Sequence, residues 1–327
     1  MNQPEFSVII PAYRAAATIS RTLASVINHR DINVEVIVVE DGSFDNTKEI
    51  VATFPNVRLI SLPVNKGVCY ARNTGLANAR SAFVLFLDAD DALEGPILEG
   101  MIDVLRKEST DMVFAPWRFD GPSAEDVSIK HAKRVDTDEW LAAWAAGSQW
   151  AWACPSRIAW RRTSLIAIGA WNLAFPKKED TELMVRALTA GLHFGVSDLG
   201  CSVYWRANTD TARSYTFSDE IFQCQWGIYA LLKKMLLRDD PPNQKLQFGV
   251  AEFCYRIASL AIPRGNISEG KRWLREAKSL EMPRPLGVKP YSILLTVLWL
   301  KYKPSLEWQI RKLRTFRHGR GTTPDVD

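Results

Sequence analysis

The chain has 327 residues, of which 47% are hydrophobic and 24% charged, and its formal net charge is +4. This is the composition of an ordinary folded protein, and it excludes a chain that stays disordered for lack of apolar residues. The length allows one main domain with a smaller part beside it. No apolar run approaches the about 20 residues that a membrane-spanning helix needs.

Cysteine and histidine are few and widely spaced. The five cysteines form no C-x-x-C pair and the four histidines no H-x-x-x-H pair, so we expect buried, reduced thiols and no zinc site. Residues 1–6 are polar and lead straight into an apolar run, without the apolar core of a signal peptide. We therefore expect a cytoplasmic protein.

Apolar, β-branched runs alternate with helical patterns as far as residue 115. The expected strands are 6–10, 34–39, 57–62, 83–87 and 112–115. This alternation predicts an α/β fold with a mostly parallel central sheet and helices on both faces. Ligands bind such sheets beyond the carboxyl ends of the strands. Residues that follow these strands should therefore face one crevice, and they are Pro11, Ala12, Tyr13, Asp41 and the run 88–90.

The acidic run Asp88-Ala89-Asp90, with Asp91 behind it, follows the strand candidate 83–87. Carboxylates at a sheet rim suit a hard cation that shares its ligands with a phosphate. If the run is extended, side-chain alternation directs Asp88 and Asp90 to the same side. An acidic cluster in this place can equally begin a loop or cap a helix.

The segment 11–19 after the first strand contains no glycine. A dinucleotide-binding fingerprint and a Walker loop both need glycines so that the backbone can approach the phosphates. Both kinds of nucleotide site are therefore excluded here.

Six short motifs, in this order, resemble those of family 2 glycosyltransferases with the GT-A fold. They are 7–13 (SVIIPAY), 38–43 (VVEDGS), 65–67 (NKG), 71–73 (ARN), 87–91 (LDADD) and 179–180 (ED). The resemblance implies an inverting transfer of sugar from a nucleoside-diphosphate sugar, most often a UDP-sugar, with Mg²⁺ or Mn²⁺. The acceptor would be a glycan or a lipid-linked molecule in polysaccharide or glycoconjugate synthesis. We expect a GT-A domain at 1–215 and a helical C-terminal region at 216–327.

The resemblance also implies a role for each residue in the donor site. Pro11, Ala12 and Tyr13 would lie near the base, and Asp41 would accept the imide N–H of uracil. Asp88 would lie near the ribose and Asp90 would ligate the metal.

Cations in these motifs would offset the charge of the diphosphate. Arg72 and Lys66 are the candidates, although either can also be a solvated cation on a helix face. Farther along the chain, the resemblance implies that Arg206 also lies near the diphosphate. Asn208 stands where many members of the family carry a histidine, so a role for that histidine does not transfer.

Asp180 is the expected general base, which takes the proton of the acceptor hydroxyl. Its neighbour Glu179 is a possible substitute. Without the resemblance, acidic residues in the first turn of a helix are explained by the helix dipole alone.

Tryptophans gather between 140 and 171. Trp140 and Trp144 are four apart on an expected helix and are assigned to the core. For both Trp150 and Trp152, the core and an acceptor cleft are equally good assignments.

Residues 289–320 combine a short apolar segment with a basic run. They predict either a peripheral membrane contact or a core helix followed by a solvated tail. No basic face elsewhere indicates nucleic acid.

Two other functions use a similar scaffold. A sugar nucleotidyltransferase usually needs a glycine-rich N-terminal loop, which this chain lacks. A non-catalytic glycan-binding module on a transferase scaffold would not need Asp90 and Asp180.

Overall fold

The computed structural model describes residues 3–29, 32–107, 109–122, 124, 126–206 and 218–280. The chain forms two compact units, residues 1–250 and residues 251–327. The expected boundary near residue 215 stays a prediction. Residues 289–320, the segment expected to contact a membrane or the core, lie outside the described residues.

A seven-stranded sheet forms the centre of the first unit, in the order β3-β2-β1-β4-β8-β6-β9. All neighbouring pairs are parallel except those of β8, which lies antiparallel to both β4 and β6. The expected mostly parallel sheet is therefore confirmed. The strands are β1 (Phe6–Ala12), β2 (Val34–Glu40), β3 (Val57–Ser61), β4 (Phe83–Phe86), β6 (Met112–Phe114), β8 (Ile158–Arg161) and β9 (Phe194–Val196).

A three-stranded sheet, in the order β5-β10-β7, accompanies the central one. Its strands are β5 (Ala92–Glu94), β7 (Trp117–Asp120) and β10 (Cys201–Trp205). β5 follows the acidic run directly, so this small sheet brings β10 and β7 close to it.

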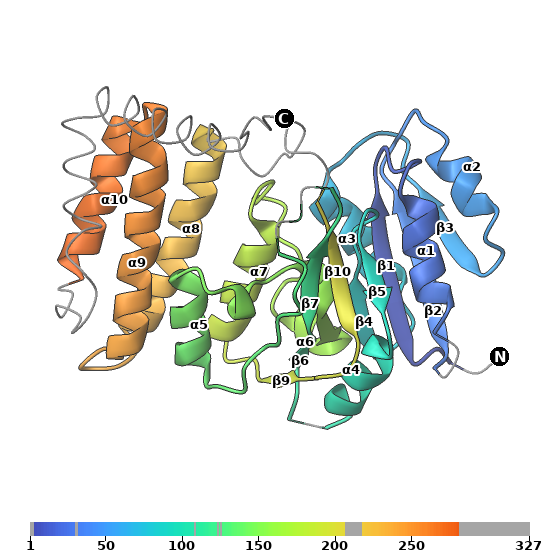
Figure 1. The fold of residues 1–327 in the computed structure, drawn as a ribbon, viewed down its shortest axis with the longest axis horizontal. Coiled ribbons are helices and arrows are strands. Elements are labelled where there is room, and N and C mark those ends of the chain that lie inside the picture. The colour runs from blue at the N-terminus through green and yellow to red at the C-terminus, as the bar shows by residue number, and fades with distance from the viewer. Residues whose placement is uncertain are drawn as a thin grey trace, which may run out of the picture. The chain divides into compact units, whose positions relative to one another are not determined.

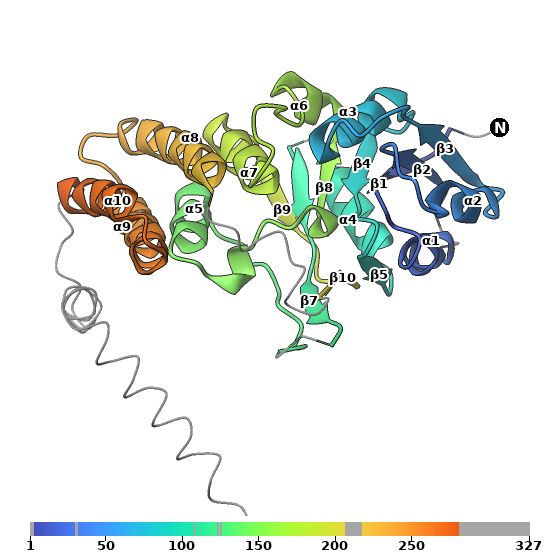
Figure 2. The same cartoon turned by 90° about the horizontal axis from the view of Figure 1, so that it is seen from above.

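Helices cover both faces of the central sheet, with α3 and α6 on one side and α1 and α4 on the other (Figures 1 and 2). The first unit contains α1 (Ile19–Ile27), α2 (Thr47–Ala52), α3 (Val68–Asn78), α4 (Ile97–Leu105), α5 (Thr137–Ala145), α6 (Arg162–Ala167), α7 (Glu179–Thr189) and α8 (Asp219–Leu236). Short 3₁₀ turns, η1 (Gln149–Ala151) and η2 (Pro155–Arg157), precede β8.

The core is built from the alternation of side chains along the strands. Val8 and Ile10 of β1 pack with Leu23 of α1 on one face. On the other face, α3 approaches so closely that a Cβ on Gly75 would lie 2.3 Å from a methyl group of Ile9. Both faces of β1 are therefore covered, which explains why its sequence is a continuous apolar run.

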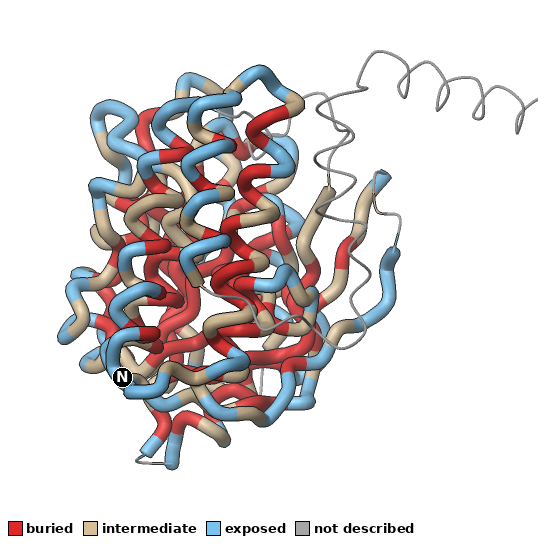
Figure 3. Tube along the Cα trace, turned by 90° about the vertical axis from the view of Figure 1, so that its left-hand side faces the viewer, coloured by how far each residue is buried: buried red, intermediate tan, exposed pale blue. Residues whose placement is uncertain are grey.

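The helices after residue 217 confirm the helical pattern expected there. Ile221, Cys224, Ile228 and Leu232 of α8 are all buried, and Ser218 caps that helix by accepting from the Ile221 amide. The helix α9 (Gln244–Ala261) runs across the division between the units. Buried and exposed stretches alternate along the helices in Figure 3, as expected of helices with one apolar face.

The second unit, as far as it is described, contains η5 (Ile262–Arg264) and α10 (Ile267–Ser279). Trp273 of α10 is fully buried and meets Phe253 edge to face. None of the helices in the described ranges is long and apolar enough to cross a bilayer.

All five cysteines lie in described segments and are free and buried, as expected. Trp140 and Trp144 are buried too, which confirms their assignment to the core.

Candidate active site

The acidic residues after β4 form a turn, in which the Asp91 amide donates to the Asp88 carbonyl at 3.0 Å. The expectation of an extended segment here was wrong, because this hydrogen bond closes a turn where the chain passes from β4 of one sheet to β5 of the other. Ala89 is nevertheless buried while Asp90 is exposed. The turn therefore presents the Asp90 side chain at the surface. We call residues 88–91 the acidic turn.

Helix α1 holds the backbone of the acidic turn. The hydroxyl of Thr22, a fully buried residue, lies 2.9 Å from the Ala89 carbonyl and 2.7 Å from that of Asp91. Arg21 donates to the carbonyl of Asp90. Nothing in the sequence of α1 marked either residue as part of a site.

Arg72 connects the acidic turn to the beginning of α7. Its guanidinium donates to Asp88 at 2.6 Å and to Glu179 at 3.3 Å, and it lies over the ring of Trp171 at 4.2 Å. The residue is 2% exposed, which excludes a solvated cation on a helix face. Burial alone would lower the pKa of Arg72, but the charges of Asp88 and Glu179 raise it above its ordinary value.

Asp90 has no described cation within ion-pair distance of its carboxylate. Surrounding atoms shield the carboxyl group from water, even though part of the side chain reaches the surface. This desolvation, together with the charge of Asp88, raises the pKa of Asp90 to about 6. A cation bound at this position would reduce the electrostatic repulsion between Asp88 and Asp90.

The protein by itself offers few ligands to a metal ion. Among the described residues, no group of three or more histidine, cysteine, aspartate or glutamate side chains is arranged to hold one. Asp90 is the available oxygen ligand, because Asp88 is engaged by Arg72. These residues fit a Mg²⁺ or Mn²⁺ ion that takes most of its ligands from water and substrate phosphates.

Glu179 and Asp180 begin α7, as expected, and follow Lys178, whose backbone is left-handed with φ 59°. Burial raises the pKa of both acids, and the charge of Asp180 adds to the effect on Glu179. Glu179 is paired with Arg72, whereas Asp180 accepts from the adjacent Thr181 amide at 2.7 Å. Asp180 is therefore the carboxylate of this pair that is left without a described ion-pair partner.

Asp41 lies at the end of β2 and connects two loops. Its carboxylate accepts from the amides of Lys66 at 2.7 Å and Gly67 at 2.8 Å, one on each oxygen. Its own amide donates to the carbonyl of Ala12 at 2.8 Å. Three motif segments expected to meet at the donor site, at residues 12, 41 and 66–67, are therefore in contact.

Gly42 is required for this contact between loops. It has φ +70°, and a Cβ there would lie 2.5 Å from the backbone of Val64. Backbone atoms cannot move aside as a flexible side chain can, so any other residue would push the loop 64–67 away.

The remaining donor-site candidates lie around this junction. Pro11 and Ala12 are buried at the end of β1, and Tyr13 is half-buried with Arg14 over its ring at 5.2 Å. The ammonium of Lys66 lies 3.3 Å from the hydroxyl of Tyr70. Among the described residues, no hydrogen bond or ion pair joins this junction directly to the acidic turn.

Four aromatic rings pack together beside the small sheet, and we call them the aromatic cluster. They are Trp117, Phe119, Trp152 and Tyr204. Arg206 lies over the Phe119 ring at 3.7 Å. Burial and the charges of Asp91, Asp88 and Asp90 raise the pKa of Tyr204. Asn208 lies outside the described residues.

A buried arginine, Arg157, holds the segment that carries Trp152. It donates to the carbonyls of Ala115 at 3.0 Å, Trp150 at 3.1 Å and Trp152 at 2.9 Å. Burial lowers the pKa of Arg157 to about 10. Arg157 was missed by sequence reasoning, because its partners are main-chain carbonyls that leave no residue signature.

Comparisons with known proteins find similar sequences and similar folds. Residues 7–156 match the family model described as glycosyl transferase family 2. An uncharacterized glycosyltransferase of Haemophilus influenzae is 29% identical over 141 residues, which are 42% of this chain and 56% of that protein. The succinoglycan biosynthesis protein ExoO of Rhizobium meliloti is 39% identical over 102 residues, 31% of this chain and 29% of that protein.

A third relative is the Escherichia coli UDP-Glc:alpha-D-GlcNAc-diphosphoundecaprenol beta-1,3-glucosyltransferase WfgD. It is 36% identical over 115 residues, which are 35% of this chain and 46% of that protein. The chain thus covers between 29% and 56% of the length of these three relatives.

Solved structures share the fold. TarS 1-349 of S. aureus in complex with UDP-GlcNAc matches with a TM-score of 0.63 and 21% identity over 84% of this chain and 79% of that one. The same protein in complex with UDP gives a TM-score of 0.64 and 19% identity over 99% and 94%. The GT-A fold expected from the motifs is confirmed.

Proposed function

We propose that the chain transfers a sugar from a UDP-sugar to a hydroxyl of a glycan or lipid-linked acceptor, inverting the anomeric carbon. The match of residues 7–156 to the model of glycosyl transferase family 2 supports this function. The name of the E. coli relative specifies UDP-Glc and a diphosphoundecaprenol-linked acceptor. The related solved structures include complexes with UDP-GlcNAc and UDP.

One observation carries the proposal. Arg72 contacts both Asp88, on the acidic turn, and Glu179, beside Asp180. A group suited to bind the donor and a group suited to act as a base therefore lie around one buried guanidinium. An inverting transfer needs the donor-binding group and the base on opposite sides of the same sugar carbon.

The donor base would bind at the junction around Asp41. Each carboxylate oxygen of Asp41 accepts one amide hydrogen and retains a second lone pair. One of these lone pairs would accept the imide N–H of uracil. Cytosine has no such donor, so this contact would select uridine nucleotides.

Asp180 would act as the general base toward the acceptor hydroxyl. The raised pKa makes this carboxylate a stronger base, and a general base works best when its pKa lies near the operating pH. Glu179 is held by Arg72 and would serve to keep that guanidinium in place.

Asp90 would hold the Mg²⁺ or Mn²⁺ ion together with the diphosphate oxygens. When bound, such an ion neutralises the negative charge that develops on the departing diphosphate. Asp88 and Arg72 would then orient the ribose side of the donor, since their mutual contact fixes both side chains.

The experiment that tests this function is a screen of purified protein against UDP-, GDP- and dTDP-sugars with and without Mn²⁺. A bound ligand raises the free energy of unfolding by about 2.7 kcal/mol at a hundredfold excess over its Kd. We expect stabilisation by a UDP-sugar and none by the others. Absence of stabilisation by every UDP-sugar, with or without metal, would contradict the proposal.

We also propose a peripheral membrane contact through residues 289–320, at the cytoplasmic face. The support is the sequence alone, a short apolar segment followed by a basic run. Deleting residues 301–327 should release the protein from vesicles rich in anionic lipid while donor hydrolysis continues. Unchanged vesicle binding would remove this part of the proposal.

A further inference from the structure

Asp91 is the acid of the turn that faces into the protein. It is 1% exposed, and its two carboxylate oxygens accept from the Trp205 amide at 3.0 Å and from the Ser156 hydroxyl at 3.1 Å. These partners follow it in the chain by 114 and 65 residues. One carboxylate therefore joins the acidic turn to β10 and to η2.

The partners of Asp91 belong to the elements that carry the aromatic cluster. Trp205 follows Tyr204, whose ring lies 4.9 Å from that of Trp152. Ser156 precedes Arg157, which holds the carbonyl of Trp152. Ser156 is also connected to Ser202 of β10 through their hydroxyls at 2.7 Å.

The contacts on the other side of the turn are of a different kind. Thr22 and Arg21 of α1 reach only its carbonyls, and Arg72 reaches Asp88. Asp91 supplies the side-chain contacts from the turn to η2 and β10. The pairing of β5 with β10, and Arg21, which lies over the Trp205 ring at 4.0 Å, also join these parts. Asp91 adds the side-chain contacts that hold the turn to both β10 and η2, and so helps to fix the position of Asp90 relative to the aromatic cluster.

We propose that Asp91 is a positioning residue for sugar transfer: it binds neither donor nor metal, but sets the distance between the Asp90 side chain and the aromatic cluster. This inference rests on the proposed function, because sugar transfer is the reaction whose geometry Asp91 sets. Loss of this connection should lower kcat more than it raises KM for the donor, because the nucleotide-base junction at Asp41 is untouched.

The test uses Asp91→Ala and Asp91→Asn in the full chain, with hydrolysis of the best UDP-sugar from the screen as readout. Groups that orient metal ligands typically contribute about 10- to 100-fold to activity. We expect Asp91→Ala to lose kcat by that order while donor KM changes by less than about threefold.

Asp91→Asn should restore most of the lost kcat. Its amide oxygen can accept from the Trp205 amide, and its NH₂ group can donate to the Ser156 hydroxyl, which then donates to Ser202. A negative charge is not needed for this arrangement. If Asp91→Asn is as inactive as Asp91→Ala, the charge itself is used, and the positioning role is overturned.

Ser156→Ala keeps the test decisive if Asp91→Ala does not fold. It removes one of the two contacts of Asp91, so kcat should fall by a few fold, as expected for one hydrogen bond. The matched control is Ser164→Ala. It removes the hydrogen bond of 2.6 Å that Ser164 of α6 donates to Asp111, away from the acidic turn. Ser164→Ala should leave kcat unchanged.

The outcomes separate this inference from the proposed function. If the wild-type protein neither binds nor hydrolyses any UDP-sugar, the proposed function fails and the inference with it. If the wild type is active and Ser156→Ala retains its full kcat, the inference alone is overturned. A rise in donor KM without a fall in kcat would likewise overturn it, because it would place Asp91 in donor binding.

Discussion

Arg72 donates to Asp88 across 2.6 Å from a position where almost none of the guanidinium is exposed. Removing one partner of a buried ion pair typically costs about 3–5 kcal/mol, since the other charge is left uncompensated. Arg72→Ala should therefore lower the free energy of unfolding by that order and abolish donor hydrolysis.

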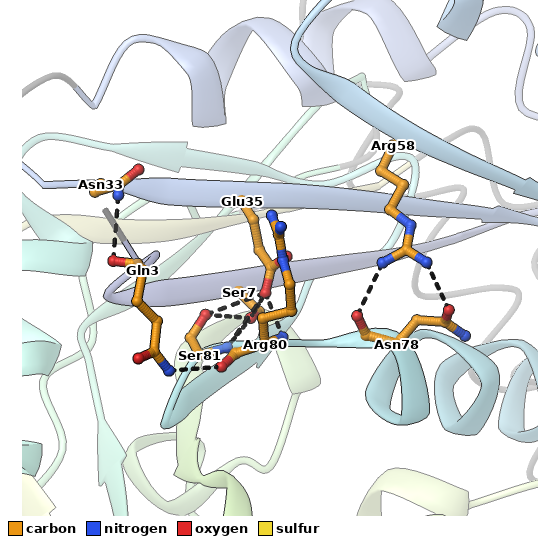
Figure 4. A network of polar contacts seen from close by, with 8 residues as sticks. All are labelled: Gln3, Ser7, Asn33, Glu35, Arg58, Asn78, Arg80 and Ser81. Atoms are coloured by element: carbon orange, nitrogen blue, oxygen red, sulfur yellow. Dashed lines mark hydrogen bonds and ion pairs between the residues drawn. The ribbon is translucent and has the colours of Figure 1, made fainter. Parts of the chain in front are cut away.

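Arg72→Lys should not rescue either property. Arg72 reaches Asp88 and Glu179 from two different nitrogens of a planar group that lies over Trp171, and the compact ammonium of lysine lacks this fork. Thermal unfolding and hydrolysis assays check both variants. Arg58→Ala, which removes an exposed arginine bonded to Asn78, is the control and should change neither (Figure 4). A fully active Arg72→Lys would show that charge alone is required.

Asp41→Ala should weaken UDP binding by about 10- to 100-fold, the range for a hydrogen bond to a charged group. Pyrophosphate binding should change less, because the predicted contact is to the base. Calorimetric titration with both ligands measures the difference. Equal losses would mean that Asp41 only supports the loop at Lys66 and Gly67.

Asp90→Ala should remove the effect of Mn²⁺ on UDP affinity while the protein stays folded, since the side chain is exposed on the turn. Titrating UDP with and without Mn²⁺ gives the result directly. The matched control is Asp103→Ala, which changes an exposed aspartate on α4, outside the acidic turn. Mn²⁺-dependent affinity equal to the wild type in Asp90→Ala would refute the metal assignment.

Asp180→Asn should leave UDP-sugar affinity almost unchanged and lower kcat of transfer by about 10²- to 10⁴-fold, the usual contribution of a general base. The wild-type product should have the anomeric configuration opposite to that of the donor. NMR of the first product formed decides this point. Retention of configuration would overturn the role of Asp180 even if the variant were inactive.

Glu35 provides a prediction about pH. Its buried carboxylate accepts from the Ser7 hydroxyl at 2.5 Å, the Arg80 amide at 2.6 Å and the Arg80 Nε at 3.0 Å (Figure 4). Burial raises its pKa, but the bonds from Ser7 and Arg80 outweigh that effect, so the pKa lies below the ordinary 4.5. The charged form is therefore favoured by folding.

Glu35→Gln should lower the free energy of unfolding by about 1.5–3 kcal/mol at pH 7. The difference between wild type and variant should be full above about pH 4.5 and shrink as the pH falls through the lower folded-state pKa, where the wild type also becomes neutral. Denaturant unfolding at several pH values measures it. A difference that stays constant down to pH 2 would contradict this account.

Most of the parallel strands were predictable because their side chains are buried on both faces, which gives continuous apolar runs. β1, β2, β3, β4 and β6 were all expected within two residues of their ends. β5, β7, β8, β9 and β10 were not, since charged residues, glycine or serine interrupt the apolar pattern in their sequences. The antiparallel insertion of β8 depends on long-range pairing that no local pattern shows.

The site was predictable in its residue types and not in its contacts. Asp88, Asp90 and Asp180 stood out as acids at the ends of elements. That Arg72 would bind Asp88 and Glu179 together could not be read from the sequence, because Glu179 is 107 residues away. The inward role of Asp91 was hidden for the same reason, since a buried acid and an exposed one have the same letter.

The strand order has a consequence for synthesis on the ribosome. β3, β2, β1 and β4 are neighbours and are complete by residue 86, so this half of the sheet can pair as it emerges. β6 pairs only with β8 and β9, which end at residues 161 and 196. β6 therefore remains unpaired until about 50 further residues have been translated. The half of the sheet that carries Asp41 and the acidic turn has its strands in place before α7, with Asp180, is made.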